Sequence, residues 1–266
     1  ENRHFGPAIG LALDGTGLGD DGTLWGGEAL LVNTAKLEHR RLARFSQVML
    51  PGGDGATREP WRLARAYLHA LGIGEPKGRP WPWLAEHSGA DKIIAQMLAR
   101  RLNSPLSSSC GRLFDAVAAM LGLCQRISYE GQAAIKLEAI QDKDEKGVYT
   151  CPIIEYDDII ELHTLELFAQ AHAQWSEGVC PSKISRRFHL GLIDGLTRLC
   201  VRLAEKCSCS TVALSGGVMQ NLTLACGLPS ALAQSGLSVL THQSLPPNDA
   251  CISLGQAAYG TLVLQP

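Results

Sequence analysis

Residues 8–32 read AIGLALDGTGLGDDGTLWGGEALLV, and this stretch decides the fold. Its apolar run at 8–14 ends at Asp14 and predicts a buried strand. A segment rich in glycine and aspartate follows, and the apolar run at 24–33 predicts a second strand. Residues 39–50 predict a third, so the chain is expected to open as a three-stranded meander.

The rest of the chain is mostly helical in pattern until its last quarter. A helix that begins at Glu59-Pro60-Trp61 and ends near Gly72 has proline in its first turn and glycine at its end. Helical periodicity dominates 85–200, and we interpret the polar, acidic stretch at 138–160 as a solvated connection. The last quarter predicts a strand, a helix, a strand and a helix, at 210–217, 220–236, 237–242 and 249–264.

Alternating strands and helices near the C-terminus imply a parallel part of the sheet with helices packed on it. A three-stranded meander that leads into such a sheet has the element order of an RNase H-like lobe. We therefore predict an α/β fold in three parts. Residues 1–84 form the first part of the lobe, 85–206 a large helical insertion, and 207–266 the second part of the lobe, in the order β-α-β-α.

Composition argues against several functional classes. A formal charge of −2 over 266 residues gives no basic surface for nucleic acid or for an anionic membrane. The nine cysteines include no C-x-x-C pair, which disfavours a structural zinc site, and most have apolar neighbours. This cysteine usage, with no signal peptide or membrane-spanning run, predicts a cytoplasmic protein.

The segment after the first predicted strand carries the first candidate for chemistry. Asp14 stands at the carboxyl end of that strand, where open α/β sheets bind their ligands. Gly15 and Gly17 let the backbone approach a ligand closely, and exposed amides in such a turn bind anions. An acid among phosphate-binding amides needs a cation, so Asp14 is interpreted as a ligand of a divalent metal. A plain hairpin with acids at turn positions is an equally good explanation.

Two segments near the C-terminus carry further candidates. A predicted strand runs into Ser215-Gly216-Gly217 and then a helix, which directs backbone amides toward an anion, although a tight turn alone also explains the glycines. Asn221, one turn into that helix, could hydrogen-bond a base or a phosphate. Asp249 is explained locally as a helix N-cap, or it pairs with Asp14 at the ligand edge of the sheet.

Isolated charged residues in the helical region are weaker candidates. Asp115 interrupts an apolar helix face, and Glu130 precedes Gly131. Acids near a nucleotide commonly bind ribose hydroxyls, and surface helix charge is the alternative explanation. His39 and His189 are isolated, and we expect them to be packed or exposed rather than to be ligands.

Taken together, six segments resemble one family. They occur in the order found in the Kae1-like domain of the HypF family, the hydrogenase maturation carbamoyltransferases. The segments are DGTGLGDDGTLWGGE, LPGGD…REPW, SSSCGRLFDAVAAMLG, YEGQAA, LSGGVMQN and SLPPNDACISLGQ. The resemblance spans nearly the whole chain. It implies the actin/Hsp70-like (ASKHA) fold, two RNase H-like lobes around a nucleotide cleft, of which this chain supplies the second lobe and the helical insertion.

The resemblance also implies an activity and its ligands. HypF proteins make carbamoyl adenylate from carbamoyl phosphate and ATP in a separate YrdC-like domain. The Kae1-like domain transfers the carbamoyl group to the C-terminal cysteine of HypE, and this group becomes the cyanide ligands of [NiFe] hydrogenase. The implied cofactors are therefore ATP or carbamoyl adenylate and a divalent metal, and the implied partner is a HypE-like acceptor. Transfer would be metal-assisted: the thiolate attacks the polarised carbamoyl carbon, the bond from that carbon to the phosphate oxygen breaks, and AMP leaves.

Site residues carry over position by position. Asp14 and Asp249 match the metal-binding acids and form the predicted catalytic pair. The predicted nucleotide-binding residues are Gly15, Thr16, Gly17, Gly111, Asp115, Glu130, Gly131, Ser215, Gly216, Gly217 and Asn221.

Two departures from the family pattern bear on these expectations. The His-rich metal motif of the family, of the type H-H-x-x-H, lies upstream of the opening strand, and this chain begins after that point. The carboxylates alone suit Mg²⁺, whereas a shell completed by histidines would suit iron or zinc. Ala250-Cys251 also stands where the family usually has Gly-Gly. We therefore expect this fragment alone to be a poor catalyst.

Other functions stay open on the sequence. One is a carbamoyltransferase that acts on a small-molecule hydroxyl and shares the same site. Another is a non-catalytic lobe that binds a nucleotide or a partner, which the absent histidines favour. A sugar kinase-like ATPase is less favoured, because no sugar pocket or neighbouring general base is evident.

Overall fold

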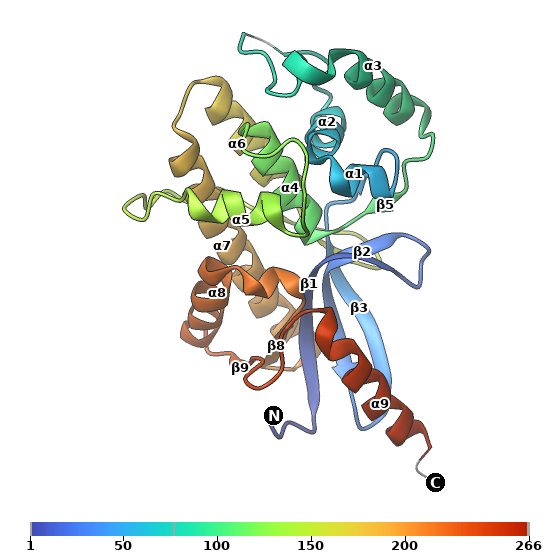
Figure 1. Cartoon of the computed structure of the whole chain (residues 1–266). Helices are drawn as coiled ribbons and strands as arrows, with labels where there is room; N and C mark the ends of the chain where they lie inside the picture. The colour runs from blue at the N-terminus through green and yellow to red at the C-terminus, as the bar shows by residue number, and fades with distance from the viewer. Residues whose placement is uncertain (1, 77, 265–266) are drawn as a thin grey trace.

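A mixed β-sheet with helices on its end and on one face forms the protein (Figure 1). The computed structural model describes residues 2–76 and 78–264, and within them nine strands join one sheet. The main strand order is β6-β7-β3-β2-β1-β8-β9, and the short β4 and β5 pair at the side of β2. The strands are β1 Pro7–Leu18, β2 Leu24–Asn33, β3 Glu38–Phe45, β4 Val48–Met49, β5 Leu106–Ser107, β6 Ile153–Glu155, β7 Ile160–Leu162, β8 Thr211–Ser215 and β9 Ser238–Leu240.

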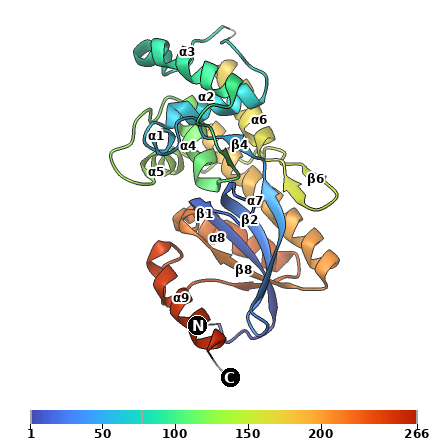
Figure 2. The ribbon, with the colours of Figure 1, turned by 90° about the vertical axis from the view of Figure 1, so that its right-hand side faces the viewer.

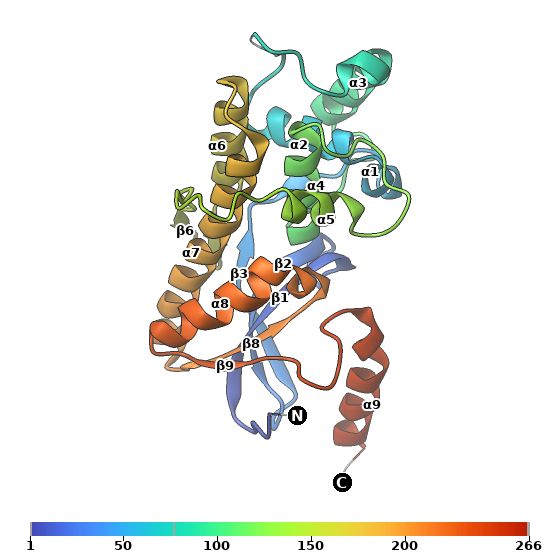
Figure 3. The same cartoon turned by 60° about the vertical axis from the view of Figure 1, so that its left-hand side comes forward.

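The helices cover two sides of this sheet. Helices α1 to α6 gather over the end where β1 and β8 finish (Figure 2), while α7 and α8 lie along one face (Figure 3). The α-helices are α1 Asp54–Arg58, α2 Pro60–Ala70, α3 Leu84–Arg100, α4 Cys110–Met120, α5 Gln132–Ala139, α6 Leu165–Ser176, α7 Pro181–Cys207, α8 Leu222–Gln234 and α9 Ile252–Val263. Two 3₁₀ turns, η1 Gly217–Gln220 and η2 Asp249–Cys251, precede α8 and α9.

The sheet combines a meander with parallel strands, as expected for the predicted α/β class. Strands β1, β2 and β3 pair antiparallel in chain order, and β8 and β9 continue the sheet in parallel from β1. Because β1 and β8 run in the same direction, their carboxyl ends meet at one edge of the sheet. The third strand is shorter than predicted: it ends at Phe45, and Val48–Met49 pairs with β5 instead.

The acidic stretch at 138–160 is not only a solvated connection, and that interpretation was wrong for its second half. β6 starts at Ile153 and forms a hairpin with β7, which extends the sheet in parallel beside β3. Tyr149 and Cys151, just before this hairpin, are buried. The apolar runs here are too few and too short to produce a recognisable strand pattern. The hairpin is held in the sheet because β7 pairs with β3.

The opening glycine-rich stretch forms a hairpin that contains a bulge. β1 continues through Leu18 rather than ending at Asp14, and only residues 19–23 turn. The pairing with β2 shifts between Leu13, which is opposite Gly27, and Gly17, which is opposite Trp25. The extra β1 residues bulge out of the ladder here, which redirects the backbone locally. The structure is therefore compatible with both interpretations of this stretch. It forms a hairpin, and it also places Asp14 in the bulge of that hairpin.

Helix α9 lies apart from the remainder of the molecule (Figures 2 and 3). Residues 252–263 are all described, and none of them is buried. Within the described ranges, no helix combines the length and apolar character needed to cross a bilayer.

Gly216, which follows β8, offers a test of close backbone packing. Its φ is 105°, and a Cβ atom there would overlap the backbone of Leu13 on β1. We expect Gly216→Ala to lower the free energy of unfolding by about 3 kcal/mol, because strain and overlap act together. Urea denaturation measures the change.

The matched control for that variant is Gly236→Ala. Gly236 has a φ of 83° but open space around its Cβ position, so only the backbone strain applies, about 1 kcal/mol. Equal losses in the two variants would show that the contact with Leu13 is unimportant.

Candidate functional site

A cavity of about 560 Å³ opens beside the β1 bulge, just past the last parallel pair of β1 and β8, Ala12 with Ser215. Its walls come from the β1 bulge, the start of α4, the segment before and within α5, the η1 turn and the η2 turn. The structure brings many of the residues predicted from sequence to this cavity. They are Asp14, Gly15, Gly111, Asp115, Glu130, Gly131, Gly217, Asn221 and Asp249.

Four other predicted residues do not line the cavity. Thr16 and Gly17 are exposed farther along the hairpin. The Ser215 hydroxyl lies 3.1 Å from Nε2 of His242, and Gly216 donates its amide to the Pro247 carbonyl at 2.8 Å. These last two contacts connect the segment after β8 to the loop that leads to η2, so here Ser215 and Gly216 shape the site from outside.

Two glycines pack so closely on Asp14 and Gly15 that a Cβ atom at either position would crowd its neighbours. A Cβ atom on Gly217 would lie 3.1 Å from the Asp14 Oδ1 atom. On the other side, a Cβ atom on Gly111 would lie 3.2 Å from the Gly15 Cα atom and 3.3 Å from the Asp14 carbonyl oxygen. Asp14 is half-buried, and its Oδ1 accepts the Gly15 amide at 2.8 Å. The bulge, α4 and η1 therefore meet around this carboxylate.

Asp249 is exposed at the rim of the same cavity, and its explanation as an N-cap was wrong. The cap of η2 is Asn248, whose side-chain oxygen accepts the Ala250 amide at 3.2 Å. An asparagine caps as well as an aspartate does, so the sequence alone could not tell which of the two neighbours has this role. The Asp249 carboxylate is left without a capping bond.

Asp115 forms a buried ion pair with Arg112 one turn earlier on α4. The Arg112 Nη2 atom lies 2.8 Å from the Asp115 Oδ2 atom, and Asp115 is 3% exposed. Burial raises the pKa of Asp115, and the guanidinium opposes that shift. Arg112 was not predicted as a site residue; its spacing of three from Asp115 on a helix was the available signal.

Asn221 is the N-cap of α8, not a residue one turn into the helix as predicted. Its Oδ1 accepts the Leu224 amide at 3.1 Å, and its Nδ2 lies 3.1 Å from Nε2 of the fully buried His189. The other His189 nitrogen, Nδ1, donates to the Ser185 carbonyl at 2.7 Å, which leaves Nε2 as the acceptor. His189 is packed, as expected, but it also orients a cavity residue, and no local motif indicated that.

Negative charge dominates the cavity. Among the described residues that line it, five carry carboxylates and one, Arg112, carries a cation, which is paired with Asp115. A nucleotide phosphate would be repelled here unless a cation accompanied it. Among the described residues, no group of three or more His, Cys, Asp and Glu side chains is placed to hold a metal ion. Two carboxylates suit Mg²⁺, which is usually bound by one or two carboxylates together with substrate phosphates and water.

Comparison with known families identifies a matching domain. The family model described as "Carbamoyltransferase, Kae1-like Domain, second subdomain" matches residues 10–256. Carbamoyltransferase HypF2 of Cupriavidus necator is 40% identical over 94% of this chain, which spans 33% of that protein. A carbamoyltransferase HypF homolog of the same organism is also 40% identical over 94% of the chain, which spans 64% of it.

Solved structures agree with this match. A crystal structure of full-length HypF in a phosphate- and nucleotide-bound form superposes with a TM-score of 0.87 at 31% identity. It covers 98% of this chain, which spans 40% of that structure. HypF of T. kodakarensis superposes with a TM-score of 0.83 at 29% identity over 97% of this chain, which spans 34% of it.

The buried His189 predicts a pH dependence of stability. Burial lowers its pKa to about 4, while an unfolded histidine keeps a pKa near 6.5. Between these values the unfolded chain binds the proton and the folded chain does not, so stability falls as the pH falls from about 6.5 to about 4. This group accounts for about 3 kcal/mol of the loss, and His189→Gln should remove that share.

Urea unfolding of the wild type and His189→Gln at pH 4.5 and pH 7 measures this difference. His39→Gln, which removes an exposed imidazole on β3, is the control and should keep the wild-type dependence. A His189→Gln protein with the same pH dependence as the wild type would contradict the assignment.

Proposed function

We propose that the cavity is part of a carbamoyl-transfer site. The premise is that this chain belongs to the HypF carbamoyltransferase family, as the second subdomain of its Kae1-like domain. The donor would be carbamoyl adenylate, and the acceptor the C-terminal cysteine thiol of a HypE-like protein. The observation that carries the proposal is the meeting of Asp14, Asp249 and Gly217 at the carboxyl edge of parallel strands. This is the edge at which open α/β sheets bind ligands.

Each wall of the cavity would have a separate role. Gly217 and Val218, at the start of η1, would offer backbone amides to a phosphate. Asp14 and Asp249 would hold a divalent cation, which when bound supplies positive charge to polarise the carbamoyl group. Asp115 and Glu130 would accept hydrogen bonds from ribose hydroxyls. The nucleotide bound in the related full-length HypF structure supports a nucleotide as the ligand.

The finer fold assignment belongs to the same proposal. We assign the chain to the actin/Hsp70-like superfamily, as an RNase H-like lobe with an insertion over 85–206 that is mainly helical and also adds β5, β6 and β7 to the sheet. The meander with parallel β8 and β9 supports this assignment. The reducing cytoplasm is the compartment that the cysteine usage favours.

A non-catalytic lobe that binds a nucleotide is the second candidate. The observation in its favour is the donor set, since the described residues present two cavity carboxylates for a metal and no cluster of three ligands. In that case the cavity would bind a nucleotide with Mg²⁺ but would not support transfer.

The binding part of the proposal is tested by isothermal titration with ATP, with and without Mg²⁺. Asp14→Asn keeps the acceptor for the Gly15 amide but removes the charge, so Mg²⁺-dependent affinity should fall by at least about tenfold. Asp20→Asn is the control, because Asp20 is exposed on the same hairpin and does not line the cavity. Absence of ATP binding by the wild type would exclude a nucleotide site on this chain.

The transfer part needs a complete enzyme. In a chimera, this chain replaces the matching third of HypF2 from Cupriavidus necator, and transfer of labelled carbamoyl to an acceptor thiol is followed. We expect transfer by the chimera and a loss of at least about 100-fold in Asp249→Ala, since a charge that stabilises the transition state is removed. The Asp20→Ala chimera should remain active. A chimera that binds ATP but transfers nothing would support the non-catalytic lobe.

A further inference from the structure

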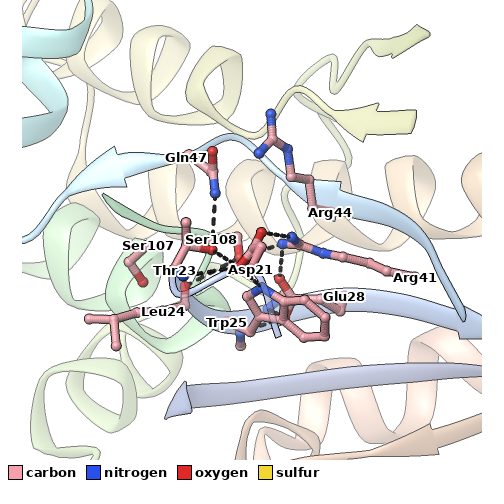
Figure 4. A network of polar contacts seen from close by, with 12 residues as sticks. Asp21, Thr23, Leu24, Trp25, Glu28, Arg41, Arg44, Gln47, Ser107 and Ser108 are labelled. Atoms are coloured by element: carbon pink, nitrogen blue, oxygen red, sulfur yellow. Dashed lines mark hydrogen bonds and ion pairs between the residues drawn. The ribbon is translucent and has the colours of Figure 1, made fainter. Parts of the chain in front are cut away.

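A buried carboxylate outside the cavity accepts four hydrogen bonds, and Figure 4 shows the polar network around it. Glu28 on β2 is 2% exposed. Its Oε2 accepts the amides of Gly26 at 2.5 Å and Gly27 at 2.7 Å, and its Oε1 accepts Arg41 Nη2 at 2.7 Å and the Ser108 hydroxyl. A carboxylate has about four lone-pair sites, so the donors match its full capacity.

Arg41 extends this network to the tip of the hairpin. Its Nη1 donates to Asp21 Oδ2 at 2.8 Å, and its guanidinium lies 4.1 Å from the centre of the Trp25 ring. Asp21 also accepts bonds from Thr23 and from the Trp25 indole. The network therefore joins β2, β3, the hairpin tip and the segment between β5 and α4.

The donors bound by Glu28 belong to the segments that flank the β1 bulge. A Cβ atom on Gly26 would lie 2.7 Å from the Gly15 carbonyl oxygen and 2.9 Å from that of Asp14. Ser108 precedes Ser109, the N-cap of α4, whose hydroxyl contacts the carbonyls of Gly15 and Asp14. Glu28 thus holds two segments that contact the backbone of Asp14 and Gly15, although it does not line the cavity.

The charge of Glu28 matters as much as its shape. A buried carboxylate is tolerated only when it is paired and hydrogen-bonded, and this one has a guanidinium and three neutral donors. Glutamine at this position would offer one oxygen and an NH₂ group. If the NH₂ group faced the Gly26 and Gly27 amides, neither could accept a hydrogen bond from it. If it faced the other side, Arg41 could not accept from it, and the Ser108 hydroxyl could do so only by turning its proton away, toward the Leu24 carbonyl.

We infer that Glu28 is a positioning residue, which sets the place of Asp14 and Gly15 against the first turn of α4. Its chemical consequence, the geometry of the Asp14 carboxylate toward a metal-bound nucleotide, rests on the proposed function. The positioning of Asp14 and Gly15 by Glu28 does not depend on the proposed function.

Glu161 on β7 provides a matched control in the same sheet. It is 7% exposed, accepts the Ser46 hydroxyl at 2.9 Å and contacts His163 Nδ1 at 3.0 Å, with Arg44 Nη2 at 3.8 Å. It is thus another buried carboxylate with a hydroxyl donor and an arginine, but it lies outside the cavity and β1 is not its neighbour. Glu161→Gln should lower the free energy of unfolding without disturbing the β1 bulge.

The test combines amide hydrogen exchange with titration of Mg²⁺·ATP on the whole chain, at a temperature where all variants are folded. In Glu28→Gln, exchange of the amides at 13–17 should accelerate about 10- to 100-fold, as expected for lost hydrogen bonds to a charged group. In Glu161→Gln these amides should exchange as in the wild type. Mg²⁺-dependent affinity for ATP should fall about tenfold in Glu28→Gln only.

The outcomes separate the inference from the proposed function. Unchanged exchange at 13–17 in Glu28→Gln, or equal acceleration in Glu161→Gln, would overturn the inference. If the wild type binds no ATP, the nucleotide proposal fails while the exchange result still decides the role of Glu28. If Glu28→Gln does not fold, Ser108→Ala removes one of the four donors and should accelerate exchange at 13–17 about three- to tenfold.

Discussion

The backbone of residues 13–15 is approached closely from three sides, and from two of them more closely than a Cβ atom permits. Gly26 of β2, Gly111 of α4 and Gly216 after β8 each leave no room for a Cβ atom against this backbone without displacement of a neighbour. Glycine at these positions lets a strand, a helix and a loop converge on Asp14. The cavity exists because of that convergence, since its walls are the segments that these contacts bring together.

The location of the cavity was predictable because it follows from topology. Once β1 and β8 are recognised as parallel strands, the residues beyond their shared pairing must lie at the same edge, and Asp14 and Gly217 come just after the last pair, Ala12 with Ser215. Side-chain direction was less predictable. Ser215 is the last residue of β8, and its hydroxyl meets His242 rather than the cavity, because alternate residues of a strand point to opposite sides.

Features that depend on partners distant in sequence could not be predicted. Nothing near Glu28 indicates that Arg41 and Ser108 will neutralise it, or that His189 will contact Asn221 across 32 positions. The β6–β7 hairpin was missed for the same reason, since its short strands are stabilised by pairing with β3. Local patterns indicate the type of an element, whereas these contacts arise only after the sheet has formed.

The parallel pairing of β1 with β8 has a consequence for the order in which the molecule is built. Ile9 pairs with Val212, so about 200 residues separate two adjacent strands, and the ribosome must synthesise all of them before the two strands can meet. Until then β1 has only its hairpin partner, while the helices between can already pack locally. Closing so long a loop is slow, because its entropy is lost before the contacts form. The edge that carries Asp14 is therefore expected to be among the last parts to assemble, and the nascent chain carries an unpaired β1 edge until β8 arrives.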